Sequence, residues 1–148
     1  MNTQTYAAST SPAANKPLTT VVPAAGRAMI SAIFLLSGMS KLAAPAMTIG
    51  YIQSAGLPLP SVAFALSAFV EIVGGIALLL GYRTRAVAVV LALFSLATAV
   101  FFHSALGDQN QFIHFFKNIA MAGGLLQVVA FGGGHISLDT RRSQGRSA

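Results

Sequence analysis

The sequence has no cysteine and very little charge. Without thiols the chain can form no disulfide bond, no thiol redox centre and no cysteine-ligated metal or iron–sulfur site. Only 8% of its 148 residues are charged, whereas ordinary soluble domains carry about a quarter. The polar remainder is therefore too small to cover a water-soluble globule of this size.

Hydrophobic residues make up 55% of the chain, and its mean hydropathy is +0.72. Four long apolar stretches meet the length that a membrane-spanning helix needs, which is roughly 20 residues with about 17 at the short end. Connectors with turn-forming or helix-breaking residues separate them. The stretches are residues 24–44, 61–81, 86–103 and 112–131. We expect an all-α membrane protein built as a four-helix transmembrane bundle.

The connector between the first two spans is too apolar for a simple loop. Pro45 can begin a short helix there and Gly56 can end it. We therefore predict a short interfacial or re-entrant segment over the outer end of the bundle. We interpret it as a packing plug rather than a moving lid.

The ends of the chain differ in composition from the centre. Residues 1–22 are rich in Thr, Ser, Ala and Pro and predict a disordered tail. A signal peptide is the alternative, but the apolar segment is longer than a signal h-region. Residues 23–140 then form the membrane domain, and residues 141–148 a basic cytoplasmic tail.

Basic residues fall mainly on one side of the predicted spans. Seven lie there: Lys16, Arg27, Arg83, Arg85, Arg141, Arg142 and Arg146. By the positive-inside rule both termini are expected to be cytoplasmic. The nine Lys and Arg form no basic stripe with interleaved aromatics, so the net charge of +6 indicates contact with lipid headgroups rather than nucleic acid.

Glu71 is one of only three acidic residues and stands within the apolar run 62–80. It shares a helix face with small and polar residues and should face the bundle interior, roughly 15 Å deep. Lys117 or Lys41 could pair with it, and Lys117 is the deeper and preferred candidate. Glu71 is then either a proton-accepting or ligand-contacting group, or half of a buried ion pair that fixes helix register.

His103 and His114 are expected at the outer rim, beside Asp108. They could bind a metal or hydrogen-bond a quinone head group. Two His and one Asp are a small donor set whose spacing matches no metal motif, so we expect no metal site. A rim His that hydrogen-bonds at the interface is the structural alternative.

The assembled motifs resemble the DoxX family of small bacterial inner-membrane proteins. The matching segments cover residues 26–139 in order: GRAMISAIFLLSGMSKLAAP, GYIQSAGLP, VEIVGGIALLLGYRTR, FFHSALGD, FFKNIAMAGGLLQVVAFGGG and ISLD. The resemblance implies four membrane helices, an inner-membrane location and an association with quinone-linked oxidoreductases. It carries no agreed catalytic residues.

Residues and resemblance together predict an outward-facing polar pocket. Glu71 would form its floor, Lys41, His103 and Lys117 its rim, and Asn118 would lie beside the rim. We expect a quinone-interacting membrane subunit with no intrinsic cofactor, which obtains electrons through a partner subunit or the quinone. The alternative is a non-enzymatic scaffold, or a binder of a lipid or small hydrophobic molecule. A transporter is less supported, and a homo-oligomer is compatible with the sequence.

Overall fold

The computed structural model describes residues 16–145, and in this part of the chain all regular secondary structure is helical. These residues form six helices: α1 (Lys16–Ala43), α2 (Pro45–Ser54), α3 (Pro60–Leu80), α4 (Thr84–Phe102), α5 (Gln109–Phe131) and α6 (Leu138–Gln144). Among them α1 (over Thr20–Ala43), α3, α4 and α5 are long and apolar enough to cross a membrane. The predicted all-α membrane fold with four spanning helices is confirmed.

The first helix begins earlier than the sequence indicates. We placed residues 1–22 in a disordered tail, yet residues 16–22 belong to α1. Pro17 is the second residue of this helix, and proline is tolerated in a first turn because the N–H it lacks has no intrahelical acceptor there. The prediction is therefore wrong for residues 16–22, and the rest of the predicted tail, residues 1–15, lies outside the described residues.

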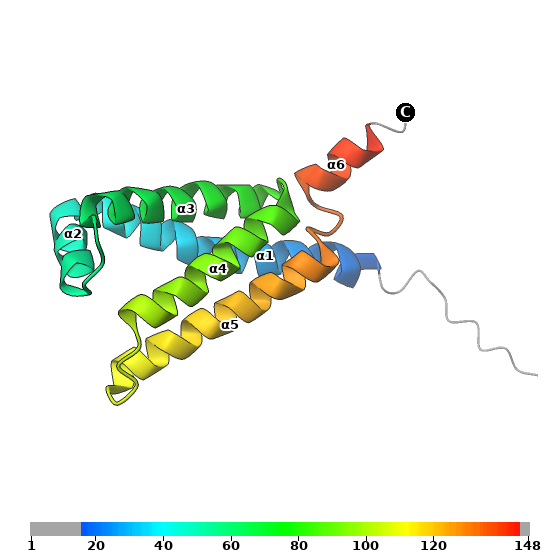
Figure 1. The fold of residues 1–148 in the computed structure, drawn as a ribbon. Helices are drawn as coiled ribbons and strands as arrows, with labels where there is room; N and C mark the ends of the chain where they lie inside the picture. Colours follow the sequence, from blue (N-terminus) through cyan, green and yellow to red (C-terminus); the bar gives the residue numbers. More distant parts are fainter. Residues whose placement is uncertain (1–15, 146–148) are drawn as a thin grey trace, which may run out of the picture.

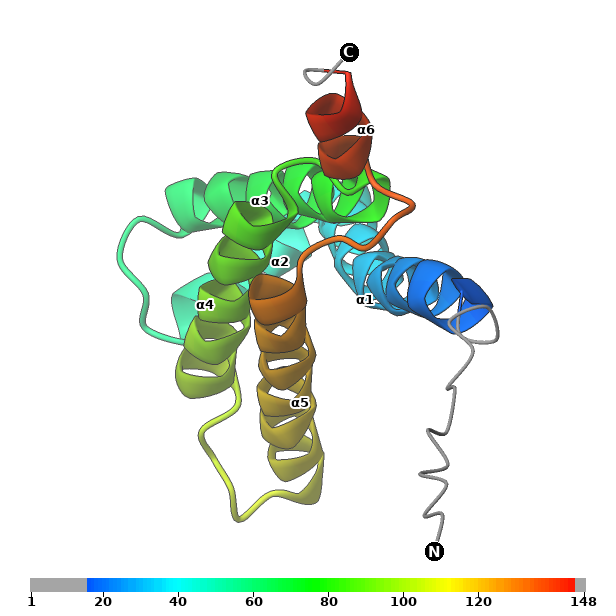
Figure 2. The same cartoon turned by 90° about the vertical axis from the view of Figure 1, so that its right-hand side faces the viewer.

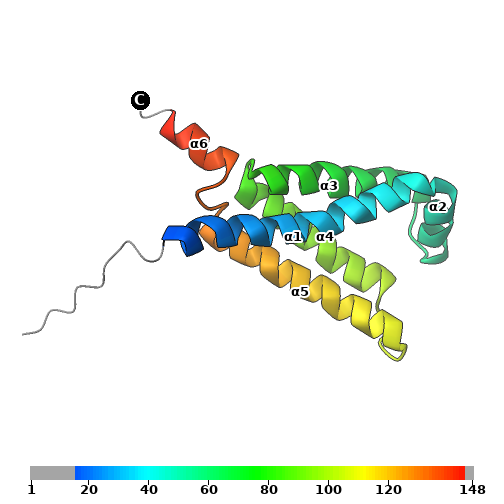
Figure 3. The same cartoon turned by 180° about the vertical axis from the view of Figure 1, so that it is seen from behind.

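The long helices pack as two pairs, α1 with α3 and α4 with α5, and α3 also contacts α4 (Figure 1). The pairs lie close together at the end that carries α6 and diverge toward the end that carries α2 (Figures 1 and 3). Figure 2 shows α6 beyond the closed end. The bundle is thus closed at its α6 end and splayed at its α2 end.

Small residues set the distance between α1 and α3. A Cβ atom added at Gly38 would lie 2.6 Å from Cγ1 of Ile72, and one at Gly75 would lie 3.0 Å from Cδ2 of Leu35. Close approach of this kind supplies packing energy in lipid, where no hydrophobic force drives helices together. The buried core continues where the two pairs meet, with Phe34, Leu78, Ala88, Leu91, Ala92, Ala122 and Leu125.

The short segment between the first two spans is helix α2, as predicted. It begins at Pro45 and ends at Ser54, and Gly56 follows with a φ of 76°. It crosses the splayed end of the bundle and packs on α3 (Figure 1), where Ile52 is buried.

Two charged residues fasten the α6 end. The Arg27 side chain is 2% exposed and donates to the carbonyls of Leu78 (3.1 Å) and Ile136. The carboxylate of Asp139 accepts from Arg83 N (2.8 Å) and from Thr84 N (2.8 Å) and Oγ1 (2.6 Å), so it caps the start of α4. The loop after α5 and helix α6 are thereby tied to α1, α3 and α4.

The Asp139 carboxyl titrates below its ordinary range. Partial burial acts to raise its pKa, but the hydrogen bonds from Thr84 and Arg83 and the nearby charge of Arg142 outweigh burial, and the pKa is lowered.

The sequence analysis did not predict helix α6. Its signal is Ser137, whose side chain accepts from Thr140 N as an N-cap. Residues 141–144 of the predicted basic tail form the end of this helix.

Candidate ligand-binding cavity

A cavity of about 660 Å³ fills the space between the diverging helix pairs in the α2 half of the bundle. Side chains of all five helices from α1 to α5 line it, and most are apolar. Ile33 on α1, Leu66 on α3 and Phe101 on α4 line it while being 50%, 60% and 58% exposed. The walls therefore extend to the lipid-facing surface, which gives a membrane-dissolved molecule a lateral route in.

One polar cluster lies on the wall formed by α1 and α3. Glu71 is 4% exposed, and Nζ of Lys41 lies 2.8 Å from each of its carboxylate oxygens. Oγ of Ser37 donates to Oε1 of Glu71 (3.0 Å) and accepts from Lys41 (2.8 Å). The absence of a side chain at Gly38, where an added Cβ would lie 3.2 Å from Cβ of Glu71, allows this approach. The prediction that Glu71 faces the bundle interior is confirmed.

The prediction that Lys117 is the preferred ion-pair partner of Glu71 was wrong. Its partner is Lys41, and Lys117 is an exposed side chain on α5 that does not line the cavity. The next residue, Asn118, is buried toward the bundle, and adjacent helical positions differ by about 100°, which turns Lys117 outward. The better signal was the chain order, since consecutive elements are usually neighbours in space and α1 precedes α3 with only a short helix between them.

A second polar cluster lies on the opposite wall, where α4 meets α5. His103, the residue that follows α4, has Nδ1 2.8 Å from Oε1 of Gln111. Its ring stacks on His114, with centroids 5.0 Å apart and an interplanar angle of 22°. Nδ2 of Asn118 donates to the His114 carbonyl (2.9 Å). Of the five candidate residues, His103, Asn118, Lys41 and Glu71 line the cavity and Lys117 does not.

Sequence reasoning left two contributors out of the site. His114 was predicted near His103 but was not assigned to the pocket, and Gln111 was not considered. Their spacing contained the signal, because residues 111, 114 and 118 lie three and four apart and so share one face of α5. A tight connection from α4 to α5 then places that face beside His103.

Helix α2 closes the splayed end of the cavity. Met47, Thr48, Tyr51 and Ile52 line it from this side. The Tyr51 ring stacks on Phe102 at 5.5 Å, and its hydroxyl donates to the Phe102 carbonyl at 3.4 Å. The cavity is thus bounded by α2 at one end and by the packed core at the other.

The cavity wall offers hydrogen-bond acceptors more than donors. All three Lys41 N–H groups are used, on Ser37 and the two Glu71 oxygens. The five lining hydroxyls all donate to protein atoms: Ser37, Thr48, Tyr51, Ser67 and Thr98. In the neutral His103 ring Nδ1–H must donate to the Gln111 carbonyl oxygen, which leaves Nε2 with a lone pair. Glu71 retains acceptor capacity as well, so His103 and Glu71 suit a ligand that donates. The donors left on the lining side chains are one Nδ2–H of Asn118 and the ring N–H of His114.

Comparison with known proteins places this fold in a family. The sequence profile described as DoxX matches residues 22–104. Inner membrane protein YphA of Escherichia coli (strain K12) is 34% identical over 120 residues, which cover 78% of this chain and 86% of that protein. Inner membrane protein YqjF of the same organism is 33% identical over 113 residues, 76% of this chain and 85% of that protein.

No solved structure matches the chain. The profile match ends with α4, so the α5 wall of the cavity, with His114 and Asn118, lies beyond it. The two similar proteins and the four long apolar helices identify a multi-pass inner-membrane protein. The chain belongs to the DoxX family.

Proposed function

We propose that the cavity binds a membrane quinone and that the chain is a quinone-interacting subunit of an inner-membrane oxidoreductase system. The observation that carries the proposal is the placement of two polar clusters on opposite walls of one apolar cavity. Glu71 with Lys41 occupies one wall, and His103 with His114 occupies the other. Ionisable groups within a span are costly and are by default functional-site candidates.

The size of the cavity and its walls suit such a ligand. Small-molecule pockets measure roughly 300–1,000 Å³ and combine apolar walls with a few placed polar groups. A quinone has a flat ring with two oxygens at opposite ends, and its hydrocarbon tail can leave through the lipid-facing gap. The opposed clusters provide one polar partner set for each end of the ring.

The acceptor surplus of the wall favours the reduced ligand. A quinol carries two hydroxyl donors, whereas a quinone carries only carbonyl acceptors. Nε2 of His103 and the Glu71 carboxylate can each accept from a quinol hydroxyl. The same groups are placed to take a proton when a quinol is oxidised, as general bases do. The chain has no cysteine, and in this proposal a partner subunit takes the electrons.

Binding of a short-tailed ubiquinol and the matching ubiquinone to the purified protein in lipid nanodiscs tests this proposal. We expect saturable binding, with the quinol bound about tenfold more tightly, because hydrogen bonds to charged or strong acceptors are worth about 1.5–3 kcal/mol. His103→Leu and Glu71→Gln should each weaken quinol binding. Lys117→Gln is the matched control, since it removes a charge from α5 outside the cavity, and it should leave binding unchanged.

Two results would count against the proposal. Absence of saturable binding for either redox form would refute it. Equal competition by a plain phospholipid or alkyl chain would favour the second candidate, a binder of a lipid or small hydrophobic molecule. The completed hydrogen bonds within the Ser37, Lys41 and Glu71 cluster are the observation that supports this second candidate, because they also suit a purely structural ion pair.

A further inference from the structure

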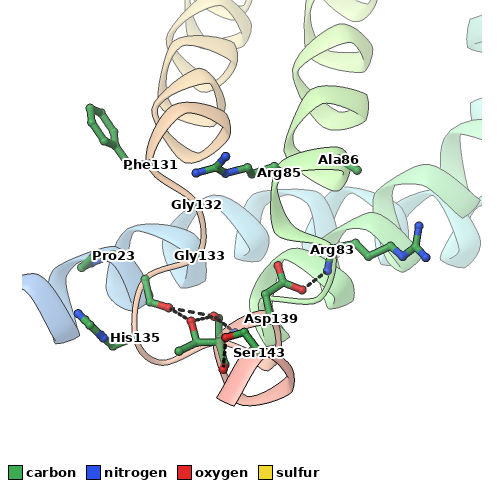
Figure 4. Close-up of a pocket in the computed structure, with 13 residues that line it drawn as sticks. Pro23, Arg83, Arg85, Ala86, Phe131, Gly132, Gly133, His135, Asp139 and Ser143 are labelled. Carbon is green, nitrogen blue, oxygen red and sulfur yellow. Dashed lines mark hydrogen bonds between the residues drawn. The ribbon is translucent and has the colours of Figure 1, made fainter. Parts of the chain in front are cut away.

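A second cavity, of about 930 Å³, lies at the α6 end, outside the site described above (Figure 4). Its walls come from the start of α1, the start of α4, the loop that follows α5, and α6. Arg85 is the second residue of α4, and Phe131 is the last residue of α5. The cavity therefore lies at the level where two membrane spans end, which is the level of the lipid headgroups.

Arg85 provides a positive charge that no carboxylate offsets. The guanidinium faces Gly132, where an added Cβ would lie 3.6 Å from Arg85 Nε (Figure 4). Its one hydrogen bond is a long one, from Nη2 to the Ala130 carbonyl at 3.4 Å. Within residues 16–145 Lys41 and Glu71 form the only ion pair, so Arg85 is not paired with a carboxylate there. A guanidinium has five N–H donors, so most of those on Arg85 remain available.

Asp139 lines the same cavity but directs its charge elsewhere. Oδ1 accepts from Arg83 N, and Oδ2 accepts from N and Oγ1 of Thr84. Figure 4 shows the carboxylate aimed at the Arg83 backbone and away from the Arg85 guanidinium. The Asp139 carboxylate is thus satisfied by the start of α4 and does not satisfy Arg85.

The loop after α5 adds further donors. The loop from Gly132, which follows α5, to Ser137 carries two glycines with positive φ, Gly132 at 80° and Gly134 at 74°. In the part of the chain that the structure describes, the backbone N–H groups of Gly133, Gly134 and His135 have no acceptor. Consecutive free N–H groups in a turn form concavities that bind anions. The cavity is therefore lined by a guanidinium with donors to spare and by loop residues whose amide N–H groups have no protein acceptor.

We propose that this cavity binds a phosphate group, and its level in the bundle favours an anionic phospholipid as the source. The planar guanidinium of arginine matches two phosphate oxygens at once, and basic pockets between the ends of spanning helices hold anionic headgroups. Phe131 lines the cavity and is 78% exposed, which provides an apolar surface for an acyl chain. The site is independent of the quinone cavity, at the opposite end of the bundle.

Native mass spectrometry with phosphatidylglycerol or phosphatidylcholine tests the proposal. The variants are Arg85→Gln, Arg85→Lys and Arg141→Gln. Arg141 is an exposed arginine of α6 that does not line the cavity, so its variant loses the same charge at the same end. We expect wild-type protein and Arg141→Gln to retain phosphatidylglycerol, and Arg85→Gln to bind it about tenfold more weakly. Arg85→Lys keeps the charge but loses the planar guanidinium, and its affinity for phosphatidylglycerol should lie between those of the wild type and Arg85→Gln.

Competition with inorganic phosphate separates the two sources. If millimolar phosphate leaves the phosphatidylglycerol in place, the lipid is the ligand. If phosphate binds saturably, displaces the lipid and depends on Arg85, the phosphate site stands and the lipid source is overturned. Equal losses in Arg85→Gln and Arg141→Gln, or retention of both lipids that Arg85→Gln does not weaken, would overturn the site itself. Retention of phosphatidylcholine that does depend on Arg85 would support the phosphate site and overturn the preference for an anionic lipid. Circular dichroism verifies that each variant is folded. If Arg85→Gln does not fold, Arg85→Lys provides the test instead.

Discussion

Replacing Lys41 by methionine removes one partner of the ion pair and keeps the apolar stem of the side chain. Glu71 then remains 4% exposed with only Ser37 as a hydrogen-bond donor. Removing one partner of a buried ion pair costs about 3–5 kcal/mol, mostly because the other charge is left without compensation. The Lys41 side chain is 23% exposed, so solvent screens part of the interaction and we expect the lower end, about 3 kcal/mol of unfolding free energy.

A double-mutant cycle in detergent micelles measures this coupling. Glu71→Gln alone should cost less than Lys41→Met, because the amide oxygen still accepts from Ser37 and Lys41. The charge left unpaired is then that of Lys41, which is 23% exposed and less buried than Glu71. The double variant should lose less unfolding free energy than the two single variants lose in sum, by about 1–3 kcal/mol. Lys117→Met is the control and should change stability by less than about 0.5 kcal/mol, since its side chain is exposed.

Two results would refute this reasoning. The first is additivity of the two single variants, which would mean that Lys41 and Glu71 do not interact in the folded protein. The second is a large loss in Lys117→Met together with a small one in Lys41→Met, which would restore the pairing that the sequence favoured.

Two further predictions concern the contact between α1 and α3 and the Asp139 contacts at the α6 end. Gly38→Val should destabilise the protein by about 1–3 kcal/mol and weaken ligand binding, because a Cβ there would lie 2.6 Å from Cγ1 of Ile72; thermal melting checks this against Gly123→Ala, where nothing lies within 4 Å. Asp139 has a folded-state pKa below the ordinary 3.8, so its stabilising contribution is complete above that value and is lost as the pH falls through the lowered pKa. Asp139→Asn should therefore reduce stability at neutral pH and flatten the acid limb of a pH–stability profile, and an unchanged acid limb would contradict this account.

Much of the fold could be predicted because lipid imposes few solutions. Each spanning helix needs a long apolar run, and its ends are marked by residues such as Pro60, Asp108 and Gly132. Proline at 45 and glycine at 56 marked the short helix α2 in the same way. The start of α1 was misplaced because composition alone does not separate a polar first turn from a tail.

The site was less predictable because it depends on helix rotation. The inward direction of Glu71 followed from its cost in lipid, which is a property of the residue itself. The choice between Lys41 and Lys117 depended on which helix lies beside α3 and on a turn of about 100° between Lys117 and Asn118. The stacking of His103 on His114 likewise arises from the α4–α5 connection, because the spacing within α5 shows only that Gln111, His114 and Asn118 share a face.

The side of the membrane on which each end lies stays a prediction. The arginines at the start of α4 and in the last turn of α6 lie at the α6 end, and the positive-inside rule assigns that end to the cytoplasm. The proposed quinone cavity would then open in the outer half of the membrane and the proposed phosphate cavity at the cytoplasmic leaflet.

The most direct test of the central claim is the amount of quinone that accompanies the protein from its own membrane. Wild type, Glu71→Gln and Lys117→Gln would be purified anaerobically in a mild detergent, then extracted with solvent and analysed by chromatography for both redox forms. Our account predicts stoichiometric ligand, largely as quinol, in wild type and Lys117→Gln, and its loss from a still-folded Glu71→Gln. No quinone in the wild type, or equal amounts in all three proteins, would contradict it.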